Sequence, residues 1–382
     1  MSTRTALEAV LELEQIASSN VFVGQPREGS KSGATRTHLF GGLIAAQSVV
    51  AASRTVPATH RIHSLHSYFI LAGDGRMPIL FRVEEIRNGG SFLTRQVLAT
   101  QENKTIFMMM ASFAKHEPGP EFQRTPEELV ALLDALLPAA GSTREQHRAG
   151  RRLLKLPQQM LQDGHQLHYG NNNRDTASLP LFSGLNHSLS WRKHLGTVNE
   201  TDGTPGWIMH AALLAYMSDE GLLSTVRQPY AATPISMSTS LDHTIHFHRG
   251  FRSDEWLLFH NETTVSSGAR GVARTQVCIM CYPMCLALAI LCYPMLSISM
   301  RVSTLMTRVM AACLQQVWTE TGVLVASFMQ EGLVRPPREW KPEVAPAEAL
   351  QAAASRTLSV LQGISRGAAT AHDDTADTRA KL

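Results

Sequence analysis

The chain has 382 residues, a formal net charge of +3 and 44% hydrophobic residues. This length is enough for one large domain or for two of ordinary size. The near-neutral charge and the ordinary apolar content argue against a nucleic-acid-binding protein and against a disordered chain. Residues 1–15 contain no apolar core segment, so we expect no secretory signal.

The first part of the chain predicts one helix followed by several strands. Residues 36–53 are small and apolar after Gly41 and Gly42, which predicts a buried helix. Alternating patterns then predict antiparallel strands at residues 64–71, 79–86, 91–100 and 105–113. This order is typical of the hotdog fold, in which a sheet wraps around a central helix.

The same pattern returns after a stretch of different character. Residues 117–198 begin with several prolines and predict a linker with local helices. Residues 207–225 then predict a second apolar helix. Further strands are predicted at residues 236–249, 255–265, 268–276 and 323–334. The chain therefore predicts an α+β protein of two hotdog repeats, with two antiparallel sheets packed as a pseudo-dimer.

The two repeats can be aligned on short matching segments. Ser64-Leu65 matches Ser240-Leu241 at an offset of about 176 residues, whereas the Ala-Ser-Phe at 111–113 matches 326–328 at about 215. The two offsets differ by roughly 40 residues. A segment of that length is therefore expected to interrupt the second repeat alone.

The excess maps to residues 277–316. This segment holds all five cysteines, contains no Asp or Glu and contains the sequence Cys-Tyr-Pro-Met in two copies. Clustered cysteines without spaced ligand pairs favour neither a disulfide framework nor a zinc site. Without the segment, Gln276 would continue directly into Val317 and a strand, turn and strand would result.

Our hypothesis for this segment is a retained intron. Val277-Cys278 can be encoded by GTATGT, a common fungal 5′ splice sequence, and Gln316 by CAG, so we expect a fungal source. Two alternatives remain: a genuine surface insertion, or a membrane-spanning helix at residues 277–300. Two Tyr-Pro pairs interrupt such a helix, and a span there would separate two strands of one sheet.

Several motifs, in order, resemble the type II acyl-CoA thioesterases of bacteria and peroxisomes. The resemblance covers residues 20–115 and 205–335 without the insert. The motifs are Phe40-Gly41-Gly42, His63-Ser64-Leu65-His66, Ser67-Tyr68-Phe69, Ala72-Gly73-Asp74, Tyr216-Met217-Ser218-Asp219, Leu241-Asp242-His243-Thr244, Phe247-His248-Arg249 and Gln330-Glu331-Gly332.

The resemblance implies hydrolysis of fatty acyl-CoA to fatty acid and CoA by an activated water. It implies no covalent intermediate, no cofactor and no metal. In that family an Asp, a Ser or Thr, and a Gln hold the water, and these positions fall on Asp219, Ser240 and Gln330. A carboxylate can accept a proton from the attacking water, while a hydroxyl and an amide can orient it.

The first repeat lacks this set. No Asp or Glu lies between residues 41 and 53, and Lys115 occupies the position of Gln330. One active site per chain is therefore expected. Two other functions stay open: a catalytically inactive acyl-CoA-binding or assembly partner with the same fold, and a dehydratase, which would need His210 paired with Asp219.

Two further patterns are weaker. Histidines at 60, 63, 66, 243, 246 and 248 suggest a metal site, although alternation puts only His246 and His248 of the second group on one face. The family shows a Trp where this chain has His246, which puts the local pocket lining in doubt. Residues 363–367 match a nucleophile elbow, but no predicted strand precedes them.

The expected domain organisation is an N-terminal repeat at 1–116, the linker at 117–198, a C-terminal repeat at 199–336 and a flexible tail at 337–382. The chain ends in Ala380-Lys381-Leu382, which is similar to a peroxisomal targeting signal. We therefore expect recognition by the peroxisomal import receptor and a location in the peroxisomal matrix, with the cytoplasm as alternative. No nucleic acid and no membrane span are expected, and a homo-oligomer is left open.

Overall fold

The computed structural model describes residues 5–26, 38–121, 157–169, 175–184, 187–198, 204–227, 234–267, 270–276, 317–318 and 323–339. Nearly all of them belong to one compact unit, Met1–Pro126 with Leu153–Arg335. A second unit, Glu127–Arg152 with Pro336–Leu382, contributes only residues 336–339 to the described part. The fold below is that of the first unit.

The described helices are α1 (Ala6–Leu11), α2 (Gly41–Ser53), α5 (Pro157–Gln162), α6 (Gly206–Ser218) and α7 (Leu222–Arg227). The strands of the first repeat are β1 (Glu14–Gln15), β2 (Val21–Gly24), β3 (His60–Phe69), β4 (Ile79–Asn88), β5 (Phe92–Gln101) and β6 (Lys104–Lys115). Those that follow are β7 (His168–Tyr169), β8 (Thr176–Gly184), β9 (His187–His194), β10 (Met237–Ser240), β11 (Asp242–Phe247), β12 (Leu257–Ser267), β13 (Arg270–Gln276), β14 (Val317–Trp318) and β15 (Leu324–Arg335).

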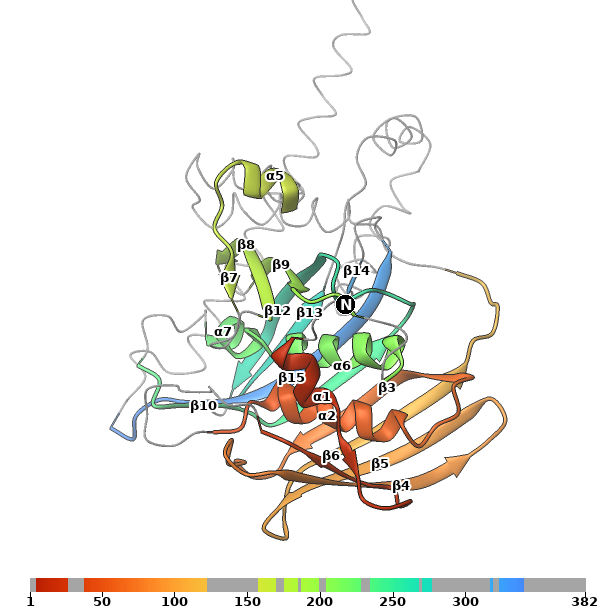
Figure 1. Ribbon diagram of the computed structural model, residues 1–382. Coiled ribbons are helices and arrows are strands. Elements are labelled where there is room, and N and C mark those ends of the chain that lie inside the picture. The colour runs from red at the N-terminus through yellow and green to blue at the C-terminus, as the bar shows by residue number, and fades with distance from the viewer. Residues whose placement is uncertain are drawn as a thin grey trace, which may run out of the picture. The chain divides into compact units, whose positions relative to one another are not determined.

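Each repeat has one buried central helix. Every residue of α2 after Gly41 is buried, and so is every residue of α6 except Trp207. A helix that is apolar all round belongs in a core, where it has no solvent face to satisfy. The two helices pack against each other, and the curved sheet lies against them (Figure 1). The double hotdog predicted from the sequence is confirmed.

Alternation in the strands follows from this arrangement. Along β5 every second side chain is buried, from Leu93 to Gln101, because one face of the sheet packs on the helices. The turn to β6 places Glu102 and Asn103 at φ values of 47° and 62°. Two consecutive residues with positive φ match the right-handed twist of a tight hairpin.

The two repeats meet edge to edge in one continuous sheet. The strand order is β1-β2-β4-β5-β6-β3-β11-β15-β13-β12-β9-β8-β7, with β10 beside β15. At the seam, β3 and β11 run antiparallel, and Ser67 lies opposite His243. These two residues differ by the repeat offset, so an approximate two-fold axis passes between them.

The interval 117–198 contains more regular structure than the predicted linker. It includes the short helix α5, but β9 pairs with β12 along residues Leu257–Glu262, and β8 pairs with β9. These strands extend the sheet of the second repeat, so that sheet begins well before residue 199. The signal was missed because β8 is interrupted by Pro180 and β9 contains four charged or histidine residues. Residues 122–156 of the predicted linker lie outside the described residues.

Strands β13 and β14 form one line in the sheet although 40 residues separate them in the sequence. On one side, Gln276 lies opposite His260 and Trp318 lies opposite Leu258. On the other side, Thr275 lies opposite Phe328 and Val317 opposite Ala326. The register is that of a strand in which residue 317 follows residue 276 directly.

Residues 277–316 themselves lie outside the described part of the chain, together with all five cysteines. Within the described part, no helix is long and apolar enough to cross a membrane. The alternative of a spanning helix at 277–300 falls on residues that this statement does not cover.

Candidate active site

Three polar side chains meet at the C-terminal end of α6. Asp219 directly follows this helix, Ser240 ends β10, and Gln330 lies on β15. Nε2 of Gln330 donates a hydrogen bond to Oδ1 of Asp219 at 2.7 Å and lies 2.5 Å from Oγ of Ser240. The Ser240 hydroxyl donates to the same carboxyl oxygen over 3.4 Å. All three predicted site residues therefore come together.

Strand pairing explains how two of them become neighbours. Strands β10 and β15 are antiparallel, with Ser240 opposite Gly332. Gln330 lies two residues further along β15, so its side chain is on the same face as that of residue 332. Diagonal neighbours on one face are within reach of a long side chain such as that of Gln.

Asp219 owes its position to the end of the helix. The sequence predicted a single helix over residues 207–225, but α6 ends at Ser218 and α7 begins at Leu222. Between them Gly221 has φ +79°, a left-handed conformation that favours glycine. The carboxylate is therefore carried by a helix cap and not by the helix interior.

A buried arginine holds this cap. The guanidinium of Arg192 donates to the carbonyl oxygen of Met217 at 3.1 Å and also to that of Glu220. Carbonyls at the C-terminal end of a helix lack the N–H partner four residues on that interior carbonyls have, and the Met217 carbonyl accepts from the cap N–H groups of Asp219 and Glu220 besides Arg192. Arg192 also packs over the ring of Phe259, with 4.7 Å from Cζ to the ring centroid. Its side chain thereby fixes the turn that carries Asp219.

The surroundings of Asp219 act on its acidity in opposite directions. Burial raises the pKa of the Asp219 carboxyl above its usual value. Hydrogen bonds from Gln330, from the backbone N–H of Gly42 and from Ser240 lower the pKa, but burial is the larger effect. A carboxylate with a raised pKa is a stronger base when ionised, which suits proton abstraction from water.

Gly42 belongs to the first repeat, so both repeats contribute to the site. A Cβ on Gly41 would lie 2.7 Å from Oδ2 of Asp219 and 2.9 Å from Cε1 of Phe69. A Cβ on Gly42 would lie 2.5 Å from the carbonyl oxygen of Tyr216. The two glycines let the start of α2 approach the end of α6 closely enough for a backbone N–H to reach the carboxylate.

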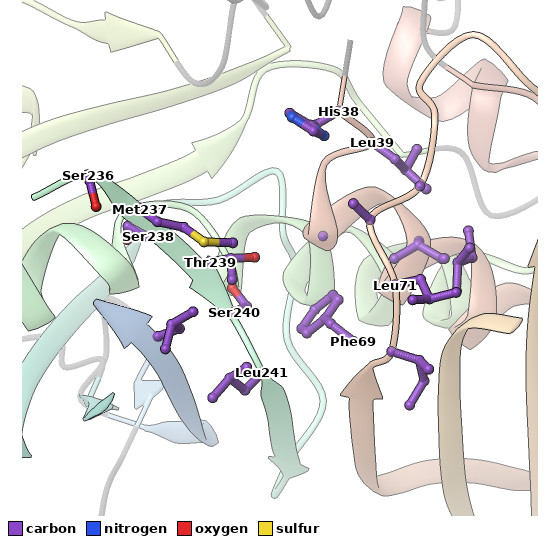
Figure 2. Close-up of a pocket in the computed structure, with 17 residues that line it drawn as sticks. His38, Leu39, Phe69, Leu71, Ser236, Met237, Ser238, Thr239, Ser240 and Leu241 are labelled. Atoms are coloured by element: carbon purple, nitrogen blue, oxygen red, sulfur yellow. The ribbon is translucent and has the colours of Figure 1, made fainter. Parts of the chain in front are cut away.

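A cavity of about 720 Å³ opens at this point. Figure 2 shows His38, Leu39, Phe69 and Leu71 of the first repeat on one side and the strand from Ser236 to Leu241 on the other. Gly41 and Ser240 line its inner end, beside Asp219. The apolar part of the wall consists of Leu39, Ile44, Phe69, Ile70, Leu71, Ala72, Ile106, Met237, Leu241 and Leu333. An apolar chain fits this wall, with its head group at the polar trio.

Comparison with known proteins identifies the family. Residues 30–114 match the model of the acyl-CoA thioesterase N-terminal domain, and residues 162–333 match that of acyl-CoA thioesterase. The chain is 33% identical over 258 residues to acyl-coenzyme A thioesterase 8 of Rattus norvegicus, covering 64% of this chain and 76% of the rat protein. The chain belongs to the acyl-CoA thioesterase family. It hydrolyses fatty acyl-CoA thioesters to fatty acid and CoA.

Two further relatives support this assignment. The thioesterase is 28% identical over 298 residues to peroxisomal acyl-coenzyme A thioester hydrolase 1 of Saccharomyces cerevisiae, covering 66% of this chain and 83% of the yeast protein. The solved structure of an acyl-CoA thioesterase II from Mycobacterium marinum superimposes with a TM-score of 0.59 at 27% identity. That match covers 88% of this chain and all of that one.

The corresponding place in the first repeat of the thioesterase has different chemistry. Arg54 caps α2 where Asp219 caps α6, and Lys115 ends β6 where Gln330 lies on β15. The Arg54 guanidinium donates to the carboxylate of Glu12 at 2.7 Å and to Oγ1 of Thr204 at 2.9 Å. A guanidinium held in this way cannot accept a proton from water. The first repeat therefore lacks the Asp and Gln of the second repeat, as expected from the sequence.

Other candidates in the thioesterase fall elsewhere. His210 lies near the start of α6, where its Nδ1 is 2.9 Å from Oγ of Ser253, so it is not paired with Asp219 as a dehydratase would need. No group of three or more potential metal ligands occurs within the described ranges. The rings of His66 and His246 pack edge-on, with centroids 5.6 Å apart. The elbow-like motif at 363–367 and the terminal Ala380-Lys381-Leu382 lie outside those ranges.

Proposed function

We propose that the thioesterase activates a water molecule with Asp219, Ser240 and Gln330, and that this second-repeat site is the one catalytic site of the chain. The proposal rests on one observation above all: the carboxylate, hydroxyl and amide are mutually within hydrogen-bond reach at the inner end of an apolar cavity. Gln330 Oε1 is buried and has no hydrogen-bond partner among the described residues. It offers an acceptor for a proton of that water.

The proton transfers follow from this arrangement. Ionised Asp219 takes a proton from the water as the water oxygen forms a bond to the thioester carbon. Collapse of the tetrahedral intermediate breaks the carbon–sulfur bond, and the thiolate of CoA leaves with the electron pair. Asp219 then returns its proton to solvent or to the thiolate. General-base assistance of this kind contributes roughly 10²–10⁴-fold.

A thiol-release assay with a panel of saturated acyl-CoA substrates tests the proposal. Ser240→Ala and Gln330→Ala each leave the general base but misplace the water, so kcat falls by about 10- to 100-fold in each variant. Glu14→Gln, an exposed carboxyl-to-amide change, serves as control and keeps full activity. Binding of acyl-CoA without thiol release by the unmodified chain would support the inactive binding partner instead.

We further propose that residues 277–316 are a retained intron, absent from the mature protein. The register of β13 and β14 supports this, because residue 317 takes the place directly after residue 276 against both neighbouring strands, and the register against β15 shifts only after it, between Val317 and Trp318. Sequencing of the mature transcript across this segment tests it. A mature message that encodes residues 277–316 would leave the genuine surface insertion as the explanation.

The location is proposed as the peroxisomal matrix. The yeast relative is named as a peroxisomal enzyme, and Ala380-Lys381-Leu382 is similar to the signal read by the import receptor. A fluorescent fusion at the N-terminus should co-localise with peroxisomes, and deletion of the last three residues should move it to the cytoplasm. An unchanged distribution after the deletion would refute the signal.

A further inference from the structure

A second cavity, of about 910 Å³, lies at the other end of α6. Pro205, Gly206 and Trp207 at the start of this helix line it. Asp219 lies beyond the last residue of the same helix. Thirteen residues at about 1.5 Å each separate the two helix ends by roughly 20 Å. The second cavity is therefore distinct from the active-site cavity.

The approximate two-fold axis relates the two cavities. The active-site cavity is formed by the start of α2, the end of β3 with the residues after it, and the β10 strand. The second cavity is formed by the start of α6, residues 247–252 at the end of β11, and residues 58–63 at the start of β3. The duplication has thus preserved a pocket in both repeats while changing its side chains.

Positive charge gathers in the second cavity. Arg61 and Lys115 line it, and neither side chain has a hydrogen-bonding or ionic partner among the described residues. Two further lining arginines are neutralised by acids, Arg249 by Glu121 at 2.9 Å and Arg252 by Asp254 at 2.7 Å. Glu117 also lines the cavity. Two unpaired cations against one carboxylate leave a surplus of positive charge.

Two of the lining histidines have lowered pKa values, which favours their neutral form. Burial lowers the pKa of His248 to about 4, with His246 and Arg249 contributing, and burial also lowers the pKa of His63. Neutral imidazoles can donate to or accept from a ligand without adding repulsion. Aromatic surface is present as well. Trp207 and Phe251 line the cavity, and the Phe251 ring stacks on that of Phe247 at an interplanar angle of 4°.

The same cavity has no means of hydrolysing a thioester. Lys115 replaces Gln330, and the Arg54 that replaces Asp219 is engaged by Glu12 and Thr204. A ligand bound there would remain intact. Unpaired cations beside flat aromatic rings are suited to a phosphate group attached to an aromatic base.

We propose that this cavity is a non-catalytic binding site for a nucleotide phosphate. The ligand chemistry is a purine or pyrimidine ring near Trp207 and Phe251 with its phosphates at Arg61 and Lys115. A free nucleotide and the nucleotide half of coenzyme A share this chemistry, and the test distinguishes the two sources.

Calorimetric titration of the full chain with ADP and, separately, with CoA tests the proposal. For a free nucleotide we expect one ADP per chain, with affinity lowered roughly tenfold or more by Lys115→Ala and again by Arg61→Ala. For CoA we expect a second equivalent per chain, beside the active-site equivalent, that the same substitutions remove. Lys104→Ala, an exposed lysine at the other end of β6, is the control and leaves binding unchanged.

Activity provides an independent readout. Lys115→Ala and Arg61→Ala should keep the kcat of the unmodified chain in nucleotide-free buffer, because neither residue lies at the active site. A normal kcat also shows that the variants fold. If neither ADP nor CoA occupies a site sensitive to these substitutions, the proposal is overturned.

Discussion

Gly41→Ala tests whether the first repeat shapes the active site of the second. The new Cβ would lie 2.7 Å from Oδ2 of Asp219, whereas ordinary van der Waals contact begins near 3.4 Å. The carboxylate or the start of α2 must therefore retreat by about 0.7 Å to restore ordinary contact. Since a misplacement of about 1 Å can cost 10²-fold, we expect kcat to fall about tenfold.

Stability should change little in the same variant. Alanine has a higher helix propensity than glycine by about 1 kcal/mol, which offsets part of the strain against Phe69. Thiol release gives kcat, and urea unfolding gives the free energy of unfolding. Gly119→Ala is the matched control, because a Cβ there meets nothing within 4 Å. Full activity of Gly41→Ala would refute the close approach of α2 to the carboxylate.

Three further predictions follow from the titratable and buried groups. Because only the ionised form of Asp219 is a base and burial raises its pKa above the ordinary value of 3.8, kcat/KM should fall as the pH falls through this raised pKa. Gln330→Ala removes a hydrogen bond that lowers the pKa of Asp219, so the pH profile of this variant should shift to higher pH. An unshifted profile would contradict the assignment. Burial lowers the pKa of His243 to about 3, so as the pH falls below 6.5 this imidazole is protonated in the unfolded chain but not in the folded one. The free energy of unfolding should therefore drop by about 2 kcal/mol between pH 6.5 and 5. Urea titrations of His243→Gln should not show this drop. Arg192→Leu removes the charged hydrogen bonds to the carbonyls of Met217 and Glu220, so the free energy of unfolding should decrease by roughly 2–4 kcal/mol and kcat should decrease. Unchanged values of both would show that Arg192 does not hold the cap.

The sequence was most informative where one periodicity persisted over many residues. The sequence located both apolar helices, α2 and α6. The strands predicted at 79–86, 91–100 and 105–113 agree with β4, β5 and β6 to within a few residues. The repeat offset also located the interruption, since β13 ends at Gln276 and β14 begins at Val317. Local pattern and internal repetition sufficed there.

Features that depend on tertiary contacts escaped the sequence. The break after α6 depends on a left-handed Gly221 and on Arg192, which comes from a distant strand. The backbone N–H of Gly42 reaches Asp219 only because two helices of different repeats pack together. Pairing of β9 with β12 overrode the weak strand pattern of the predicted linker. None of these partners is close in sequence, so no local pattern reports them.

Asp219→Asn is the measurement that tests the central claim most directly. The substitution keeps the size of the side chain and an acceptor oxygen for Gln330 but removes the base. With folding verified by an unchanged unfolding transition, we predict a loss of kcat toward fatty acyl-CoA of about 10²–10⁴-fold. Undiminished thiol release by the folded variant would contradict the account, because Asp219 is the group that the account assigns as the base.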